Sequence, residues 1–203
     1  MEGVYFYWIF WIGWIYTTFM LDKTKKRIRI TIALLLLIIF SNKYINVGAM
    51  EVNSGILFCL GYGYYLISHI KKKSILYSLS ISLILTTSYV TFRLFQLYDP
   101  VWVMFHPTLK LSLILGLMTI FLIREQLIRI GLLFIAIAQG EIFYTVFLNS
   151  IVPQPVIGQL ESLDIVAFTA SICFVWFAFE KFVAMLDEYV KQRTAVVGST
   201  KRP

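Results

Sequence analysis

The stretch that decides the fold is IGLLFIAIAQGEIFYTVFLNS, residues 130–150, which is almost wholly apolar and holds a single charged side chain, Glu141. A transmembrane helix needs about 20 consecutive, mainly apolar residues, and this stretch supplies them. Other apolar runs lie on its two sides, separated by charges, prolines and glycines. We therefore predict an all-α, polytopic transmembrane helix bundle with seven spans, near residues 4–21, 29–46, 53–70, 74–97, 109–123, 130–150 and 164–184.

The composition excludes an ordinary soluble protein. Of the 203 residues 59% are hydrophobic and 14% charged, whereas a soluble domain has roughly 45–50% apolar and about 25% charged residues. We assign residues 1–193 to a single transmembrane bundle and residues 194–203 to a disordered cytoplasmic tail. The second and fifth spans have short apolar cores, at 30–40 and 111–123. Either span could be less tilted, extended by snorkelling ends, or partly re-entrant.

The basic residues orient the chain, because short cytoplasmic loops of membrane proteins are rich in Lys and Arg. Fifteen of the eighteen basic residues fall on one side of the predicted topology, so we expect the N-terminus outside and the C-terminus in the cytoplasm. This placement explains the net charge of +7 without nucleic acid as a partner. The fifteen are Lys23, Lys25, Lys26, Arg27, Arg29, Lys71, Lys72, Lys73, Arg124, Arg129, Lys181, Lys191, Arg193, Lys201 and Arg202.

Polar residues inside two spans form the candidate intramembrane site, because ionisable groups in a membrane usually face the protein interior. Glu141 is followed at four-residue steps by Thr145 and Asn149, which places all three on one helix face. The fourth span has a polar face of its own. It consists of Ser78, Ser82, Thr86, Tyr89 and Arg93.

We predict that these two faces meet and that Arg93 pairs with Glu141 directly or through water. By residue count Arg93 lies nearer the outer surface by about eight residues, or roughly 12 Å at 1.5 Å per residue. The structural alternative is a protonated Glu141 bonded to a neighbouring helix, with Arg93 snorkelling to the outer interface. Glu161 and Asp164 are expected to be ordinary solvated charges at an external helix end.

Small residues at four-residue spacing predict close helix contacts in two spans. One set is Gly55, Cys59 and Gly63; the other is Ala136 and Gly140. These contacts would serve the fold of one chain or a homo-oligomer equally well. Both cysteines, Cys59 and Cys173, lie in apolar runs and are expected to act as buried hydrophobic residues.

Enzyme signatures are missing from the sequence. It has no G-x-x-x-x-G-K-[ST], H-E-x-x-H, G-x-S-x-G or C-x-x-C motif. The two histidines, His69 and His106, are predicted on opposite sides of the membrane, so they cannot share a metal site. We expect no catalytic residues, no cofactor and no metal, and hence no enzyme.

The opening residues resemble a known family. Met1-Glu2-Gly3, Tyr5-Phe6-Tyr7-Trp8, Trp11, Trp14 and Thr17-Thr18-Phe19 are similar to the start of the YphA family of small membrane proteins from spore-forming Gram-positive bacteria. The length and span layout are similar across the whole chain. The resemblance implies a multi-pass protein of the bacterial plasma membrane without an established activity, so it transfers no functional residue.

Two functional hypotheses follow. The leading one is a non-enzymatic membrane protein that acts by contact as a scaffold, accessory subunit or sensor partner. Its expected partners are the lipid bilayer and either another membrane protein or a second copy of itself. The alternative is a small transporter or proton-coupled channel that uses Glu141 and Arg93.

Overall fold

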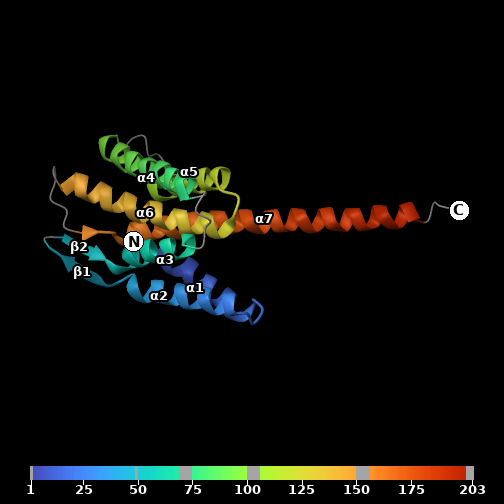
Figure 1. Ribbon diagram of the computed structural model, residues 1–203. Coiled ribbons are helices and arrows are strands. Elements are labelled where there is room, and N and C mark those ends of the chain that lie inside the picture. The colour runs from blue at the N-terminus through green and yellow to red at the C-terminus, as the bar shows by residue number, and fades with distance from the viewer. Residues whose placement is uncertain (1, 49, 69–74, 100–105, 150–155, 200–203) are drawn as a thin grey trace.

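The computed structural model describes residues 2–48, 50–68, 75–99, 106–149 and 156–199, with side chains described as far as Lys191. The predicted basic loop at 71–73, His69 and the end of the tail at 200–203 lie outside the described residues. Seven helices make up most of the described chain (Figure 1). They are α1 (Val4–Phe19), α2 (Lys25–Phe40), α3 (Ser54–Ile67), α4 (Ile75–Tyr98), α5 (Pro107–Leu122), α6 (Gln126–Asn149) and α7 (Leu160–Ser199).

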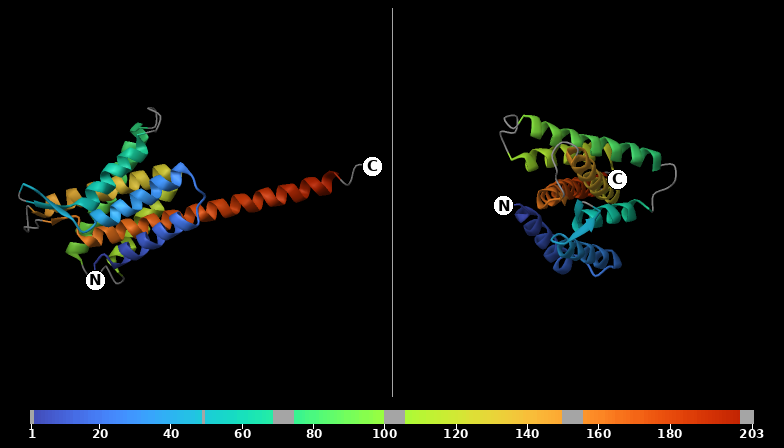
Figure 2. Two further views of the ribbon diagram at one scale, coloured as in Figure 1. Left: turned by 90° about the horizontal axis from the view of Figure 1, so that it is seen from below. Right: turned by 90° about the vertical axis from the view of Figure 1, so that its left-hand side faces the viewer.

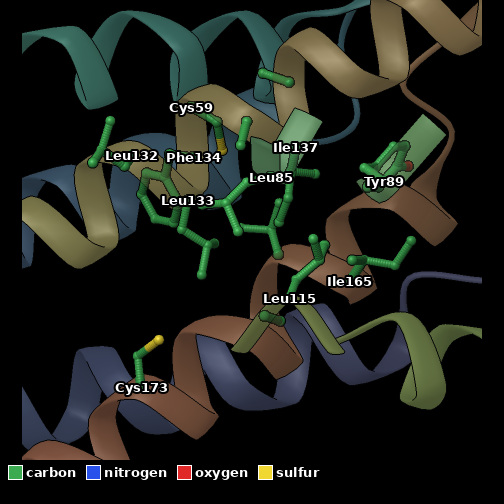
Figure 3. Packing of buried hydrophobic residues seen from close by; sticks show 14 of the residues in the cluster. Cys59, Leu85, Tyr89, Leu115, Leu132, Leu133, Phe134, Ile137, Ile165 and Cys173 are labelled. Carbon is green, nitrogen blue, oxygen red and sulfur yellow. The ribbon is translucent and has the colours of Figure 1, made fainter. Parts of the chain in front are cut away.

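The helices are arranged in three layers, with α6 and α7 in the middle (Figure 2). On one side α4 packs on α6 and α5 packs on α7. On the other side α3 packs on α6, while α1 packs on α7 and α2 lies against α1 and α3. The buried core lies between these layers and includes Leu85, Leu133 and Ile137 (Figure 3). Cys59 and Cys173 are both free and fully buried, as predicted.

The small residues allow these layers to approach closely, as predicted. A Cβ atom added at Gly63 on α3 would lie 2.7 Å from the backbone oxygen of Gly131 on α6. On the opposite face of the bundle, at a glycine that was not among the predicted small residues, a Cβ at Gly116 on α5 would lie 2.9 Å from the side chain of Ile172 on α7. Since unstrained contacts of a real Cβ are longer than this, the observed helix separations require glycine.

A short three-stranded sheet closes one end of the bundle, and the predicted all-α class did not include it. The strands are β1 (Tyr44–Val47), β2 (Met50–Asn53) and β3 (Val156–Ile157), in the order β1-β2-β3. β1 and β2 pair antiparallel, whereas β2 and β3 pair in parallel across about a hundred residues of chain. Strands this short carry no clear alternating pattern, and the pairing of β2 with β3 is non-local.

The second predicted span, 29–46, is displaced at both ends. α2 begins at Lys25 because the side chain of Thr24 accepts a hydrogen bond from the backbone N–H of Arg27 at 3.3 Å and so caps the helix. It ends at Phe40, and residues 44–46 belong to β1. After the hairpin, Asn53 caps the start of α3 through a 2.7 Å bond from the N–H of Gly55.

The end of the seventh span also differs from the prediction. α7 continues as one helix of 40 residues to Ser199, past the predicted span end at 184 and through residues 194–199 of the predicted disordered tail. The segment from 160 to 197 contains neither proline nor glycine, so nothing in its sequence ends the helix earlier. Lys191 and Asp187 add an ion pair at 2.6 Å one turn apart.

Three of the described helices are long and apolar enough to cross a membrane by length and composition: α4, α6 and the part of α7 from Leu160 to Lys191. α3 and α5 are apolar but shorter. The short fifth span predicted from the sequence therefore corresponds to a short helix of 16 residues.

Candidate functional site

The two predicted polar faces lie against each other where α4 packs on α6. The approach is close because Gly140 faces α4: a Cβ added there would lie 2.6 Å from the ring of Tyr89. One turn earlier the hydroxyl of Thr86 donates a 3.4 Å hydrogen bond to the backbone oxygen of Ala136. A further turn away, Ser82 donates to the side chain of Gln139 at 3.4 Å. The small residues of α6 thus bring the polar side chains of α4 into the interior.

A buried charge cluster lies in this contact, toward the C-terminal ends of α4 and α6. The Nη2 atom of Arg93 is 3.8 Å from Oε2 of Glu141, so the predicted pair is direct. The same Glu141 oxygen accepts a hydrogen bond from the hydroxyl of Tyr89. The Nη1 atom of Arg93 donates a 2.8 Å hydrogen bond to Oε2 of Glu161 on α7. The guanidinium also lies 5.2 Å from the ring centre of Tyr144, a cation–π distance.

The cluster is nearly closed to the surroundings and links three helices. Arg93 is 6% exposed and Glu141 is 2% exposed. Because Arg93 on α4 contacts carboxylates of α6 and α7, one guanidinium joins two layers of the bundle. A charge in this interior is strongly unfavourable when unpaired, so the three side chains hold one another in place.

The predicted 12 Å offset between Arg93 and Glu141 is absent. α6 begins at Gln126 rather than at 130, so Glu141 lies two thirds of the way along its helix. Arg93 lies near the C-terminal end of α4, and the two side chains therefore meet at one level. The cluster belongs to the end of the bundle that carries β3 and the start of α7.

Other predicted site residues differ in their placement. Ser78 and Thr145 are buried, so the polar faces are internal over much of their length. Asn149 is exposed at the last residue of α6 and lies outside the cluster. Of the eight residues predicted on the two polar faces, seven are buried and Asn149 is exposed.

Two acids that we expected to be solvated are internal partners. Glu161 is bound to Arg93 as described. The carboxylate of Asp164 accepts hydrogen bonds from the backbone N–H groups of Gly3 at 2.8 Å and Phe6 at 2.7 Å. It therefore caps the start of α1 from α7, and supplies acceptors that the first turn of a helix lacks. The only sequence signal for this role was the absence of a capping side chain before α1.

A second buried arginine links α6 to α7 at the opposite end of the bundle. Arg129, predicted as a loop residue, lies inside α6 and is 3% exposed. Its Nε donates to the backbone oxygen of Ile123 at 2.5 Å, and its Nη2 donates to Glu180 on α7 at 2.9 Å. The indole N–H of Trp176 also donates to Glu180, at 2.6 Å. This contact fixes α7 where it leaves the bundle.

Two hollows of the described surface are lined by residues outside the charge cluster. One of about 480 Å³ lies between α5 and α7 and is lined almost entirely by apolar side chains such as Leu117, Ile120 and Val175. A second, of about 340 Å³, lies between α4 and α5 beside Phe92 and Met118. Within the described residues, no three His, Cys, Asp or Glu side chains gather as a metal site would require.

A bundle of apolar helices that holds its internal charges in paired clusters defines an integral membrane protein of the helical class. Comparison with known sequences agrees. Residues 2–197 match the family described as YphA-like integral membrane protein, and the chain belongs to that family. A relative, "Uncharacterized protein YphA" of Bacillus subtilis (strain 168), is 25% identical over 205 residues, which cover 99% of each chain. No solved structure matches.

Proposed function

We propose that this protein crosses the bacterial plasma membrane seven times, with its N-terminus outside and its C-terminus in the cytoplasm. The fifteen basic residues on one side support this topology. Helices α1, α2 and α5, of 16 residues each, are about 24 Å long. They span the hydrocarbon core of about 30 Å with help from snorkelling end residues and local thinning of the bilayer.

The protein has a contact function: it acts by binding another protein, without catalysis, as a scaffold, accessory subunit or sensor partner. The observation that carries this proposal is the extension of α7, defined here as residues 181–199. The side chains from Lys181 to Lys191 are all exposed, and the helix runs far past the bundle (Figures 1 and 2). A long exposed helix anchored by Arg129 and Glu180 at its base is suited to present a surface to another protein.

In this proposal the charge cluster has a structural role. Glu141 is hydrogen-bonded by Tyr89 and paired with Arg93, while Arg93 is also bound to Glu161. The cluster therefore fixes the relative positions of α4, α6 and α7. The described hollows are lined by other residues, which supports a role in packing.

One observation favours the alternative, a proton-coupled transporter. The Nε atom of Arg93 is buried and has no hydrogen-bond partner among the described residues. An unsatisfied buried donor next to a carboxylate is a place where a water molecule or an anionic group would be stabilised. A carrier would then need Glu141 to gain and lose a proton.

Proton flux in liposomes tests the two functions. The purified protein is reconstituted into vesicles with a trapped pH-sensitive dye, and a membrane potential is imposed. If the protein acts by contact, the wild type and Glu141→Gln give the same flux as empty vesicles. A flux above that of empty vesicles that is lost in Glu141→Gln, and kept in the exposed control Glu125→Gln, would overturn the proposal in favour of transport.

Thiol labelling tests the topology, because both native cysteines are buried. We expect a membrane-impermeant maleimide to label Tyr44→Cys in intact cells, since Tyr44 is exposed on the outer hairpin. Lys191→Cys should be labelled only after permeabilisation. Labelling of Lys191→Cys in intact cells would reverse the orientation.

A further inference from the structure

The extension of α7 carries an apolar stripe whose large side chains are exposed. A helix of 40 residues is about 60 Å long, so about half of it lies beyond a hydrocarbon core of about 30 Å. Phe182 is 57% exposed and Leu186 is 49% exposed on this part. Large apolar side chains that point into water in one contiguous row mark an interaction surface.

The stripe has the spacing of a coiled coil. Its residues alternate steps of four and three: Val175, Phe179, Phe182, Leu186 and Tyr189. Over the same segment the charged side chains Lys181, Asp187, Glu188 and Lys191 lie on the other side of the helix, at 100° per residue. From Val175 to Tyr189 the seam is therefore flanked by uncharged positions, so two identical copies placed side by side oppose no like charges over that length; the next position of the repeat is Arg193.

The bilayer surface is a poor partner for this stripe. A helix that lies on an anionic membrane has a polar face rich in Lys and Arg. Here the polar side from 180 to 191 holds three acids and two lysines. The segment 160–197 also has no proline or glycine at which α7 could bend from the bundle axis into the membrane plane.

A second copy of the chain fits better, and we infer that two copies pair through a parallel coiled coil of their α7 helices along this stripe. The membrane holds both copies in the same orientation and at the same depth, so equivalent residues are aligned without further adjustment. The lower part of the stripe, at Val175 and Phe179, also lines the apolar hollow beside α5. The pairing surface is therefore continuous from the extension to the bundle. This inference rests on the proposed contact function.

Cysteine cross-linking tests the pairing with a matched control on the same helix. Leu186→Cys places a thiol on the stripe, and Glu188→Cys places one about 160° away on the polar side. Both positions are exposed, and the wild type supplies the background because Cys59 and Cys173 are buried. In vesicles that contain only this protein, mild oxidation should convert most of Leu186→Cys to a disulfide-linked dimer. Glu188→Cys should give at least fivefold less.

A second variant tests the stripe without a new thiol. Phe182→Glu should lower the dimer fraction, measured by energy transfer between labelled copies, and raise the apparent Kd at least tenfold. Lys181→Glu, on the polar side, should leave it within twofold. The thermal midpoint of the bundle should be unchanged in both, because these side chains lie beyond it.

The remaining outcomes overturn the pairing. Equal cross-linking of the two cysteine variants, or no dimer from either, excludes it. Cross-linking of Leu186→Cys in cells only to a different polypeptide refutes self-association and leaves the contact function standing. Quenching by brominated lipids of a fluorophore at Leu186→Cys would place the stripe on the bilayer. The contact function itself fails only if Glu141-dependent proton flux is found.

Discussion

Substitution of Gly63 by alanine is expected to destabilise the bundle through a specific clash. The added Cβ would lie 2.7 Å from the backbone oxygen of Gly131 and 2.8 Å from the side chain of Ile135. Ordinary Cβ contacts begin near 3.4 Å. The backbone of α6 cannot yield locally, so α3 and α6 must separate by about 0.7 Å. Overpacking of this kind costs about 1–3 kcal/mol.

Gly61→Ala is the matched control, two residues away on the same helix. A Cβ at Gly61 meets nothing within 4 Å. Both variants gain the same helix propensity, about 1 kcal/mol for Gly→Ala. The difference between them therefore isolates the clash. Gly63→Ala should be less stable than Gly61→Ala by about 1–3 kcal/mol, and about 2–4 °C in thermal midpoint per kcal/mol is expected for this chain length.

The native cysteines provide the assay. Cys59 and Cys173 are fully buried, so a thiol-reactive fluorophore reports their exposure as the protein unfolds in detergent on heating. Equal midpoints for Gly63→Ala and Gly61→Ala would refute the reasoning, because α3 and α6 would then be less closely packed than the contact requires.

Two further substitutions test the buried polar contacts by the same thermal assay. Asp164→Asn keeps the shape but loses one of the two acceptors at the start of α1, which should cost about 1–3 kcal/mol. Asp187→Asn loses only an exposed pair with Lys191 and should cost less than about 0.5 kcal/mol. Equal thermal midpoints for these two variants would show that Asp164 does not stabilise the start of α1. Arg129→Ala leaves the carbonyl of Ile123 without its donor and Glu180 with the Trp176 indole alone, and should also cost about 1–3 kcal/mol. Arg124→Ala, exposed nearby, should cost little. A neutral Arg129→Ala would show that α7 is held mainly by apolar packing.

Most of the helices could be predicted from the sequence because the signal for a membrane helix is local. A run of apolar residues and the charges that end it decide a span within some twenty positions. The boundaries of α3, α4 and α5 accordingly lie within three residues of the predictions. α2 and α7 differ more, because a capping threonine extends one and the other has no residue that ends it.

The candidate site could be predicted only in part. Periodicity placed Tyr89 and Arg93 on one face of their helix and Glu141 on one face of another, and the structure brings these faces together. Periodicity alone did not predict that Glu161 completes the cluster. That residue lies in the first turn of α7, and a charge at a helix end is usually solvated.

The sequence by itself determined that this is a membrane protein of apolar helices, because in lipid every backbone polar group must be satisfied within its own helix. Only the tertiary structure decided which buried charges meet. Arg93 and Glu161 are 68 residues apart in the chain, and Asp164 bonds to Phe6 across 158. Such pairs depend on how three layers of helices pack, and the packing is set by the fit of small and large side chains along each contact rather than by any local pattern.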